Sequence, residues 1–229
     1  MTRLLLLLIA LLPAQVFARV LDLHSDIRVA KNGEVTVTER ITVETQEGAF
    51  ALVRDLPGSA RVVDVIRDGH PASYVLEGRH LRIAGAVAQG RHLYQVTYRS
   101  SRHVQFLGGL DELRWTVKGS GFPVERLTAE VTLPSRVPPR DIKAEASVPD
   151  HQSFVRDGRA AFRVTRPLAS QESMTIVVRF PKDVVAAPGL GQRARWLFAD
   201  YGGLLFVLAG LGATAAVLRQ IGVRARFPH

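Results

Sequence analysis

Residues 27–43 read IRVAKNGEVTVTERITV, and this stretch decides the fold class. Apolar side chains recur at every second position on both sides of the Lys-Asn-Gly segment at residues 31–33. An Asn-Gly pair between two alternating runs is a strong short-range signal of a β-hairpin. The stretch therefore predicts two antiparallel strands joined by a tight turn, with one shared apolar face: Val35, Val37, Ile41 and Val43.

The alternation continues through the middle of the chain. Pairs such as Asp68-Gly69 and Asp157-Gly158 are turn signals between the alternating runs. About ten short strands with one apolar face each must pack as two sheets or close into a barrel. Irregular spacing without a repeat favours an all-β fold, an antiparallel β-sandwich over residues 19–185. Beyond the first hairpin, strands are predicted at residues 62–67, 73–76, 80–83, 92–99, 112–117, 127–133, 142–148, 160–164 and 174–180.

Residues 1–18 have the order of a secretory signal peptide. A positive charge at Arg3 precedes an apolar run over residues 4–12, and small or apolar residues end the segment. Val16 and Ala18 fit the −3 and −1 positions of a cleavage site, so cleavage is expected after Ala18. The alternative is an uncleaved anchor, but nine apolar residues reach only about 14 Å, roughly half of a bilayer core.

Residues 201–218 contain no charged side chain and are predicted to form a transmembrane helix. Eighteen residues reach about 27 Å, enough to span a bilayer core with help from the flanks. The alternative is a buried core helix, which would normally carry a polar face. Small residues four apart, such as Ala209 and Ala213, would permit a helix-mediated homodimer.

The charges around this segment predict its orientation. Arg219 and Arg224 follow it in an expected cytoplasmic tail at residues 219–229, as the positive-inside rule requires. Trp196 and Tyr201 are expected at the outer membrane interface, after a juxtamembrane linker at residues 186–200. The lipid bilayer is thus one predicted partner, and the protein is expected in the cell (inner) membrane as a single-pass protein with its N-terminal domain extracytoplasmic.

Composition limits the function classes. The net charge of +9 resembles that of a nucleic-acid-binding protein, but four of the 30 basic residues lie in the predicted leader and tail, and the others form no run. We therefore expect no nucleic-acid partner. The chain has no cysteine, which excludes disulfides, thiolate metal sites and a cysteine nucleophile.

No motif predicts a reaction. The seven histidines form no metal-binding motif, and Ser120 lies in a Gly-Ser-Gly turn with no predicted helix after it. Asp111 and Glu112 are adjacent, so on a strand they point to opposite faces and cannot share a substrate. We expect no catalytic, cofactor-binding or metal-binding residues.

Glu39 is the exception among the carboxylates. It is in phase with the apolar face of the first hairpin, and a buried glutamate needs a cation or hydrogen-bond donors. We predict an ion pair between Glu39 and Arg54. The alternative is a strand end or bulge that turns Glu39 outward.

Several segments together resemble the DUF2207 family of predicted membrane proteins. They include the hairpin at residues 32–39, VRDLP at 53–57, YQVTYR at 94–99, ELRWTVKG at 112–119 and VVRFPK at 177–182. The resemblance covers about residues 20–185 and implies an extracytoplasmic β-sandwich ahead of membrane helices. It implies no particular activity.

These observations lead to one functional expectation and two alternatives. We expect a membrane-anchored extracytoplasmic module that holds or senses a membrane or envelope protein, and not an enzyme. The first alternative is an envelope hydrolase with a site assembled from loops. The second is a truncated fragment of a larger multi-pass membrane protein.

Overall fold

The computed structural model describes residues 18–46, 48–119, 121–199 and 201. These residues form two compact units that divide between Ala186 and Ala187. The first unit is predominantly β, as the alternation predicts. Its strands are β1 (Ala18–Val29), β2 (Val35–Thr45), β3 (Gly48–Asp55), β4 (Arg61–Arg67), β5 (His70–Pro71), β6 (Val75–Glu77), β7 (His80–Val87), β8 (Gly90–Ser100), β9 (Val104–Phe106), β10 (Asp111–Lys118), β11 (Leu127–Thr132), β12 (Lys143–Ala146), β13 (His151–Arg156), β14 (Arg159–Val164) and β15 (Ser173–Phe180), with one 3-10 turn, η1 (Pro139–Asp141).

The predicted first hairpin is confirmed as β1 and β2. Ile27 pairs with Val37, and the Gly33 amide donates to the carbonyl of Ala30 across the turn. Gly33 has φ of 78°, a conformation that glycine adopts without steric cost. The Asn32 side chain accepts a hydrogen bond from the amide of Glu34, which closes the turn further.

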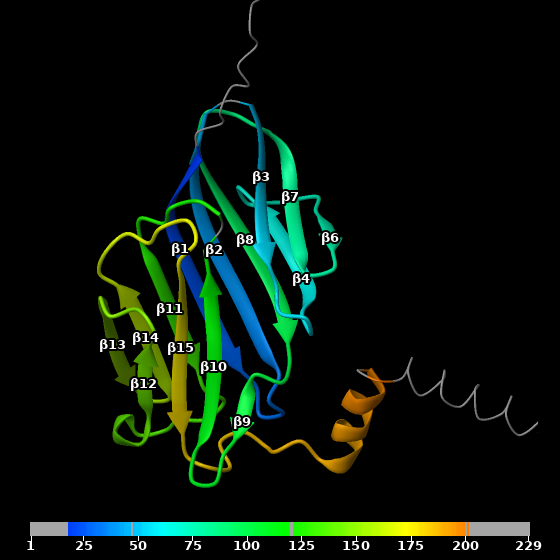
Figure 1. Ribbon diagram of the computed structural model, residues 1–229, viewed down its shortest axis with the longest axis vertical. Helices are drawn as coiled ribbons and strands as arrows, with labels where there is room; N and C mark the ends of the chain where they lie inside the picture. The colour runs from blue at the N-terminus through cyan, green and yellow to red at the C-terminus, as the bar shows by residue number, and fades with distance from the viewer. Residues whose placement is uncertain (1–17, 47, 120, 200, 202–229) are drawn as a thin grey trace, which may run out of the picture. The chain divides into compact units, whose positions relative to one another are not determined.

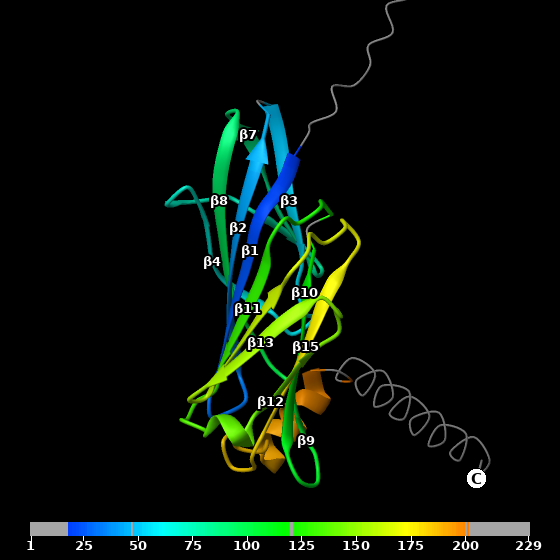
Figure 2. The same cartoon turned by 90° about the vertical axis from the view of Figure 1, so that its left-hand side faces the viewer.

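Three sheets share one core. The largest has the order β13-β14-β11-β1-β2-β8-β4-β5, and the smaller two have the orders β12-β15-β10-β9 and β3-β7-β6. Figures 1 and 2 show both smaller sheets on the same face of the eight-stranded sheet. Buried side chains from all three sheets belong to a single apolar cluster, which includes Ile41, Leu52 and Leu113. Burying these faces against one another supplies the main stabilisation of the unit.

The prediction that all strands pair antiparallel is wrong at one place. β1 pairs with β11 in parallel, with Leu23 beside Leu127 and Ile27 beside Val131. The reason is topological: two strands about a hundred residues apart become neighbours through long connections, and no short turn forces them to run in opposite directions.

Four strands were not predicted from the sequence: β3, β5, β9 and β13. β5 and β9 span only two and three residues, too few for alternation to be detected. In β3 the inward positions are Phe50, Leu52 and Arg54, so a charged residue interrupts the apolar pattern. In β13 only two of six side chains, His151 and Val155, are even partly buried, which leaves little alternation to detect.

The second unit is described over residues 187–199 and 201, where residues 190–199 are helical. The prediction of a linker at residues 186–200 misses this helix. The helix follows Pro188 and Gly189, and the Gly189 carbonyl accepts hydrogen bonds from the amides of Gln192 and Arg193. No helix within the described residues has both the length and the apolar character to cross a bilayer. The predicted signal peptide up to residue 17, and the predicted transmembrane segment beyond Tyr201, lie outside the described residues.

Candidate functional site

A buried ion pair lies where all three sheets meet. Alternation along β2 turns Glu39 inward, and alternation along β3 turns Arg54 inward. The Nε atom of Arg54 lies 2.7 Å from Oε2 of Glu39, and the two side chains are only 2% and 4% exposed. The structure therefore brings together the two residues that the sequence predicts as a pair, with Glu39 on the inner face of its strand.

Both side chains of this pair make further hydrogen bonds. Nη1 of Arg54 donates to the carbonyls of Lys118 and Gly119, at 3.0 Å each. The Tyr98 hydroxyl donates to Oε1 of Glu39 at 3.1 Å. A buried pair offsets its desolvation cost only when such additional hydrogen bonds are made. Arg54 thus connects the end of β3 to the end of β10 as well as to β2.

The protonation states follow from this environment. Burial lowers the pKa of Arg54, but the charge and hydrogen bond of Glu39 outweigh burial, so this pKa lies above its ordinary value. Burial, assisted by the charge of Glu39, raises the pKa of Tyr98 well above its ordinary value. At neutral pH the guanidinium is charged and the phenol is a neutral donor.

The pair forms the floor of a cavity of about 350 Å³. This volume is within the range of about 300–1,000 Å³ that is typical of ligand pockets. The cavity lies between strands of all three sheets, and β2, β3, β8, β9 and β10 all contribute to it. Its lining residues are Glu39, Arg54, Asp55, Pro57, Arg79, Tyr98, Arg102, His103, Gln105, Arg114, Trp115, Thr116 and Lys118.

One wall of the cavity is aromatic. The ring centroids of His103 and Trp115 are 4.6 Å apart in an edge-to-face arrangement, and Tyr98 and Trp115 are stacked at 6.3 Å. Nε2 of His103 lies 2.7 Å from the Ser100 hydroxyl, and burial lowers the pKa of His103. The indole nitrogen of Trp115 is buried and has no hydrogen-bond partner among the described residues. This wall combines a neutral imidazole with a large apolar surface.

The rest of the lining is basic. Arg79, Arg102, Arg114 and Lys118 line the cavity together with a single carboxylate besides Glu39, that of Asp55. Lys118 and Arg79 both pair with Asp55, and the hydrogen bond from Lys118 is the main cause that lowers the pKa of Asp55. Cations outnumber carboxylates in the lining, so the cavity favours an anionic occupant.

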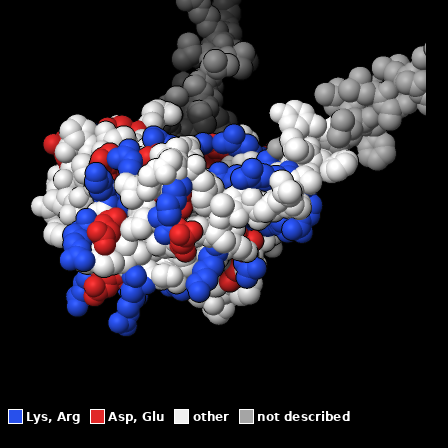
Figure 3. All heavy atoms as spheres, turned by 90° about the horizontal axis from the view of Figure 1, so that it is seen from below, with Lys and Arg blue, Asp and Glu red and all other residues white. Residues whose placement is uncertain are grey.

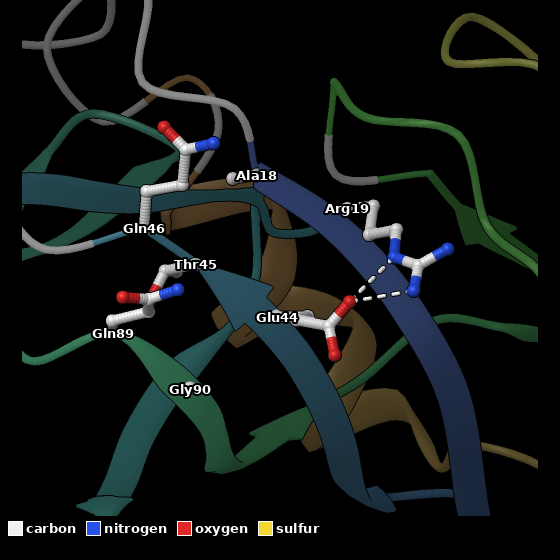
Figure 4. A pocket seen from close by; sticks show the side chains of 7 residues that line it. All are labelled: Ala18, Arg19, Glu44, Thr45, Gln46, Gln89 and Gly90. Atoms are coloured by element: carbon white, nitrogen blue, oxygen red, sulfur yellow. Dashed lines mark hydrogen bonds and ion pairs between the residues drawn. The ribbon is translucent and has the colours of Figure 1, made fainter.

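Two other cavities have fewer features of a binding site. Figure 4 shows the one of about 380 Å³ near the start of β1, where Arg19 points toward Glu44 and binds it at 2.6 Å. The other, of about 520 Å³, lies beside the loop at residues 133–136 and is lined by Arg136, Arg156 and Arg159. Neither contains a buried ion pair or an aromatic wall. The cavity above Glu39 and Arg54 is therefore the candidate site, and we call it the basic cavity.

Two of the four predicted membrane-interface residues lie in the described part of the second unit. Trp196 is partly buried and Tyr201 is 56% exposed, whereas Arg219 and Arg224 lie outside the described residues. Sequence reasoning missed most of the basic cavity. Tyr98 was detectable because it alternates with Tyr94 and Val96, but no local signal connects it to Lys118.

The described residues contain no group of three or more His, Asp or Glu side chains that could hold a metal ion. On the face drawn in Figure 3, basic side chains do not form a surface of uniform sign. The end of the molecule drawn in Figure 3 carries Lys and Arg spheres with Asp and Glu spheres between them.

These features define a class, a predominantly β domain with a preformed, basic, aromatic-walled cavity. The chain belongs to the DUF2207 family, described as the N-terminal domain of a predicted membrane protein, which matches residues 19–180. A comparison with curated proteins gives no match.

Among solved structures, the chain is similar to yeast LTA4 hydrolase in complex with Bestatin, at 14% identity and a TM-score of 0.53, over 70% of this chain and 28% of that one. Native yeast LTA4 hydrolase is similar at 13% identity and a TM-score of 0.50, over 71% and 29%. An M1 zinc metallopeptidase from Deinococcus radiodurans shows 17% identity and a TM-score of 0.45, over 70% and 42%. The chain spans less than half the length of each of these proteins. The similarity to the yeast hydrolase is one of fold.

Proposed function

We propose that this protein is a membrane-anchored extracytoplasmic binding module whose basic cavity holds a protein partner at the cell envelope. The observation that carries the proposal is the cavity itself. A buried, hydrogen-bonded ion pair lines it, and its lining is already positioned by three sheets. A preformed site loses little conformational entropy when it binds, which favours recognition.

The arrangement of side chains supports binding more than catalysis. Glu39 is only 4% exposed and already accepts hydrogen bonds from Arg54 and Tyr98. Asp55 is engaged by Lys118 and Arg79. A general acid or base has to exchange a proton with a substrate, and both carboxylates are already engaged by cationic side chains. In this proposal the two carboxylates position the basic side chains.

The membrane part of the proposal rests on the sequence and the family. The family is described as a predicted membrane protein, and it matches the segment between the two hydrophobic ends. We propose that residues 1–18 export the domain, that the domain folds as a β-sandwich, and that residues 201–218 anchor it with a single helix. The arginines after that helix favour a cytoplasmic C-terminus.

Site-specific photo-cross-linking in cells tests the proposal. A photoreactive amino acid replaces Gln105, an exposed side chain of β9 that lines the cavity, in the full-length chain. The matched control replaces Gln152, an exposed side chain of the edge strand β13 that lines none of the three cavities described above. We expect a discrete protein adduct from position 105 and none from position 152. Adducts of equal yield from both positions, or none from position 105, would refute the proposal.

A further inference from the structure

Strand β10 has a free edge beside the basic cavity. β15 pairs with all eight residues of β10, from Asp111 to Lys118. On the other side β9 pairs only with Asp111, Glu112 and Leu113. Figure 1 shows β9 beside only the first part of β10. Within the described residues, no strand pairs with residues 114–118 on this side.

At every second residue of this edge, the main-chain amide and carbonyl point away from β15, toward the side of the cavity. The Arg114 amide donates to the carbonyl of His103 at 3.3 Å, so Arg114 turns its main chain toward β9. The Lys118 carbonyl accepts from Arg54 on the same side. Successive residues of a strand direct their main-chain groups to opposite sides. Thr116, midway between these two residues, therefore directs its amide and its carbonyl toward the free edge.

The free edge of β10 forms part of the lining of the basic cavity. Four of the five residues at positions 114–118 line the cavity, namely Arg114, Trp115, Thr116 and Lys118. Arg114 and Thr116 are exposed, so a second chain can approach them. An unpaired strand edge pairs readily with an extended segment of another chain, because both sides then satisfy main-chain donors and acceptors.

The charge of the cavity indicates which segment fits. The side chains of a strand added to β10 would lie next to basic residues that line the cavity. The Arg114 side chain is 53% exposed and the Arg79 side chain 55% exposed. Carboxylates of an incoming segment can therefore reach these two guanidinium groups while they keep their contacts with Glu112 and Asp55. Positively charged segments would be repelled.

We infer that the basic cavity binds an extended, acidic segment of a partner protein, which adds as a strand to the edge of β10 around Thr116. The segment exchanges main-chain hydrogen bonds with Thr116 and places carboxylates against Arg79 and Arg114. This inference rests on the proposed function and specifies the class of partner and its mode of recognition.

Backbone methylation of a peptide probe tests the mode of binding without changing the protein. The probe is an eight-residue peptide of alternating valine and glutamate with a fluorophore, titrated by anisotropy against the full-length chain in detergent. One derivative carries N-methyl groups on the valines and a second carries them on the glutamates. Because alternate amides face β10, we expect one derivative to bind at least about tenfold more weakly and the other to bind like the parent peptide.

Charge variants test the acidic specificity. The same peptide with lysine in place of glutamate should bind at least about tenfold more weakly. The Arg114→Gln variant should bind the acidic peptide about three- to tenfold more weakly. The matched control, Arg156→Gln, changes an exposed arginine outside the basic cavity and should leave the affinity unchanged.

Each outcome separates this inference from the proposed function. Strand addition is refuted if both methylated derivatives bind equally weakly, or if both bind like the parent peptide. An adduct from position 105 would still support a binding module in either case. Failure of the acidic peptide to bind refutes the acidic specificity even if that adduct forms. Absence of the adduct, together with tight and parity-dependent peptide binding, would contradict an envelope protein partner and leave strand addition as a property of the cavity.

Discussion

The Glu39→Gln substitution tests whether the ion pair at the floor of the cavity is the device that joins the three sheets. The substitution keeps the shape of the side chain and removes its charge, so Arg54 remains buried without a counter-ion. Breaking a buried pair in this way costs about 3–5 kcal/mol. Because 1 kcal/mol shifts the melting temperature of a domain of this size by about 2–4 °C, a loss of 3 kcal/mol lowers Tm by about 6–12 °C.

The measurement is thermal unfolding of the full-length chain in detergent, followed by tryptophan fluorescence. Glu130→Gln is the matched control, because Glu130 lies on the same sheet but forms an exposed pair with Arg159. Such a pair contributes about 1 kcal/mol or less. A Tm of Glu39→Gln within about 2 °C of the control would refute the reasoning.

The double variant Glu39→Gln/Arg54→Met separates the charge from the hydrogen bonds. It removes both charges, so no buried ion remains. It still leaves the carbonyls of Lys118 and Gly119 without the donor that Arg54 supplies. We expect the double variant to be more stable than Glu39→Gln by about 1–3 kcal/mol, yet less stable than the wild type by about 2 kcal/mol. Simple additivity of the two single substitutions would show that the two residues are not coupled.

Three further predictions concern other parts of the chain. Burial lowers the pKa of His103, so the unfolded chain binds its proton at higher pH than the folded chain does; the unfolding free energy should fall as pH drops below about 6.5, and His103→Gln should have a smaller Tm loss between pH 7.5 and 5.5 than the wild type. At Gly158, φ is 81° and a Cβ atom would lie 2.6 Å from the carbonyl oxygen of Ser135, so Gly158→Ala should cost at least about 2 kcal/mol in chemical denaturation, whereas Gly69→Ala, with the same φ and open space, should cost about 1 kcal/mol. Because the chain has no cysteine, single Ser153→Cys and His229→Cys variants report topology: a membrane-impermeant maleimide applied to intact cells should label the first and spare the second, and labelling of the second would contradict the proposed orientation.

Part of the cavity could be predicted from the sequence. Period-two alternation along β2 assigns Glu39 to the apolar face, and a buried carboxylate requires a cation, which made Arg54 a candidate partner. The other residues of the cavity could not be predicted in this way. Trp115 alternates with Leu113 and Val117, which indicates a core position and no cavity, and Lys118 and Arg79 carry no signal that distinguishes them from other surface cations.

The sequence by itself determined the strands with a regular apolar face and the turns between them. The Asn-Gly turn and the alternating valines of the first hairpin act between neighbours in the chain, so a short window contains all the information they need. The same holds for the family membership of residues 19–180, which follows from ordered local segments.

Only the tertiary structure decided which strands become neighbours. β1 and β11 pair in parallel across about a hundred residues. In β3, Arg54 points inward because it pairs with Glu39 of β2, and the sequence of β3 alone does not show this. The basic cavity and the free edge of β10 arise where three sheets meet, from residues that are up to about eighty positions apart. Contacts at such distances are selected by the burial of whole sheet faces and by the pairing of buried charges. These are properties of the assembled core and of no single segment.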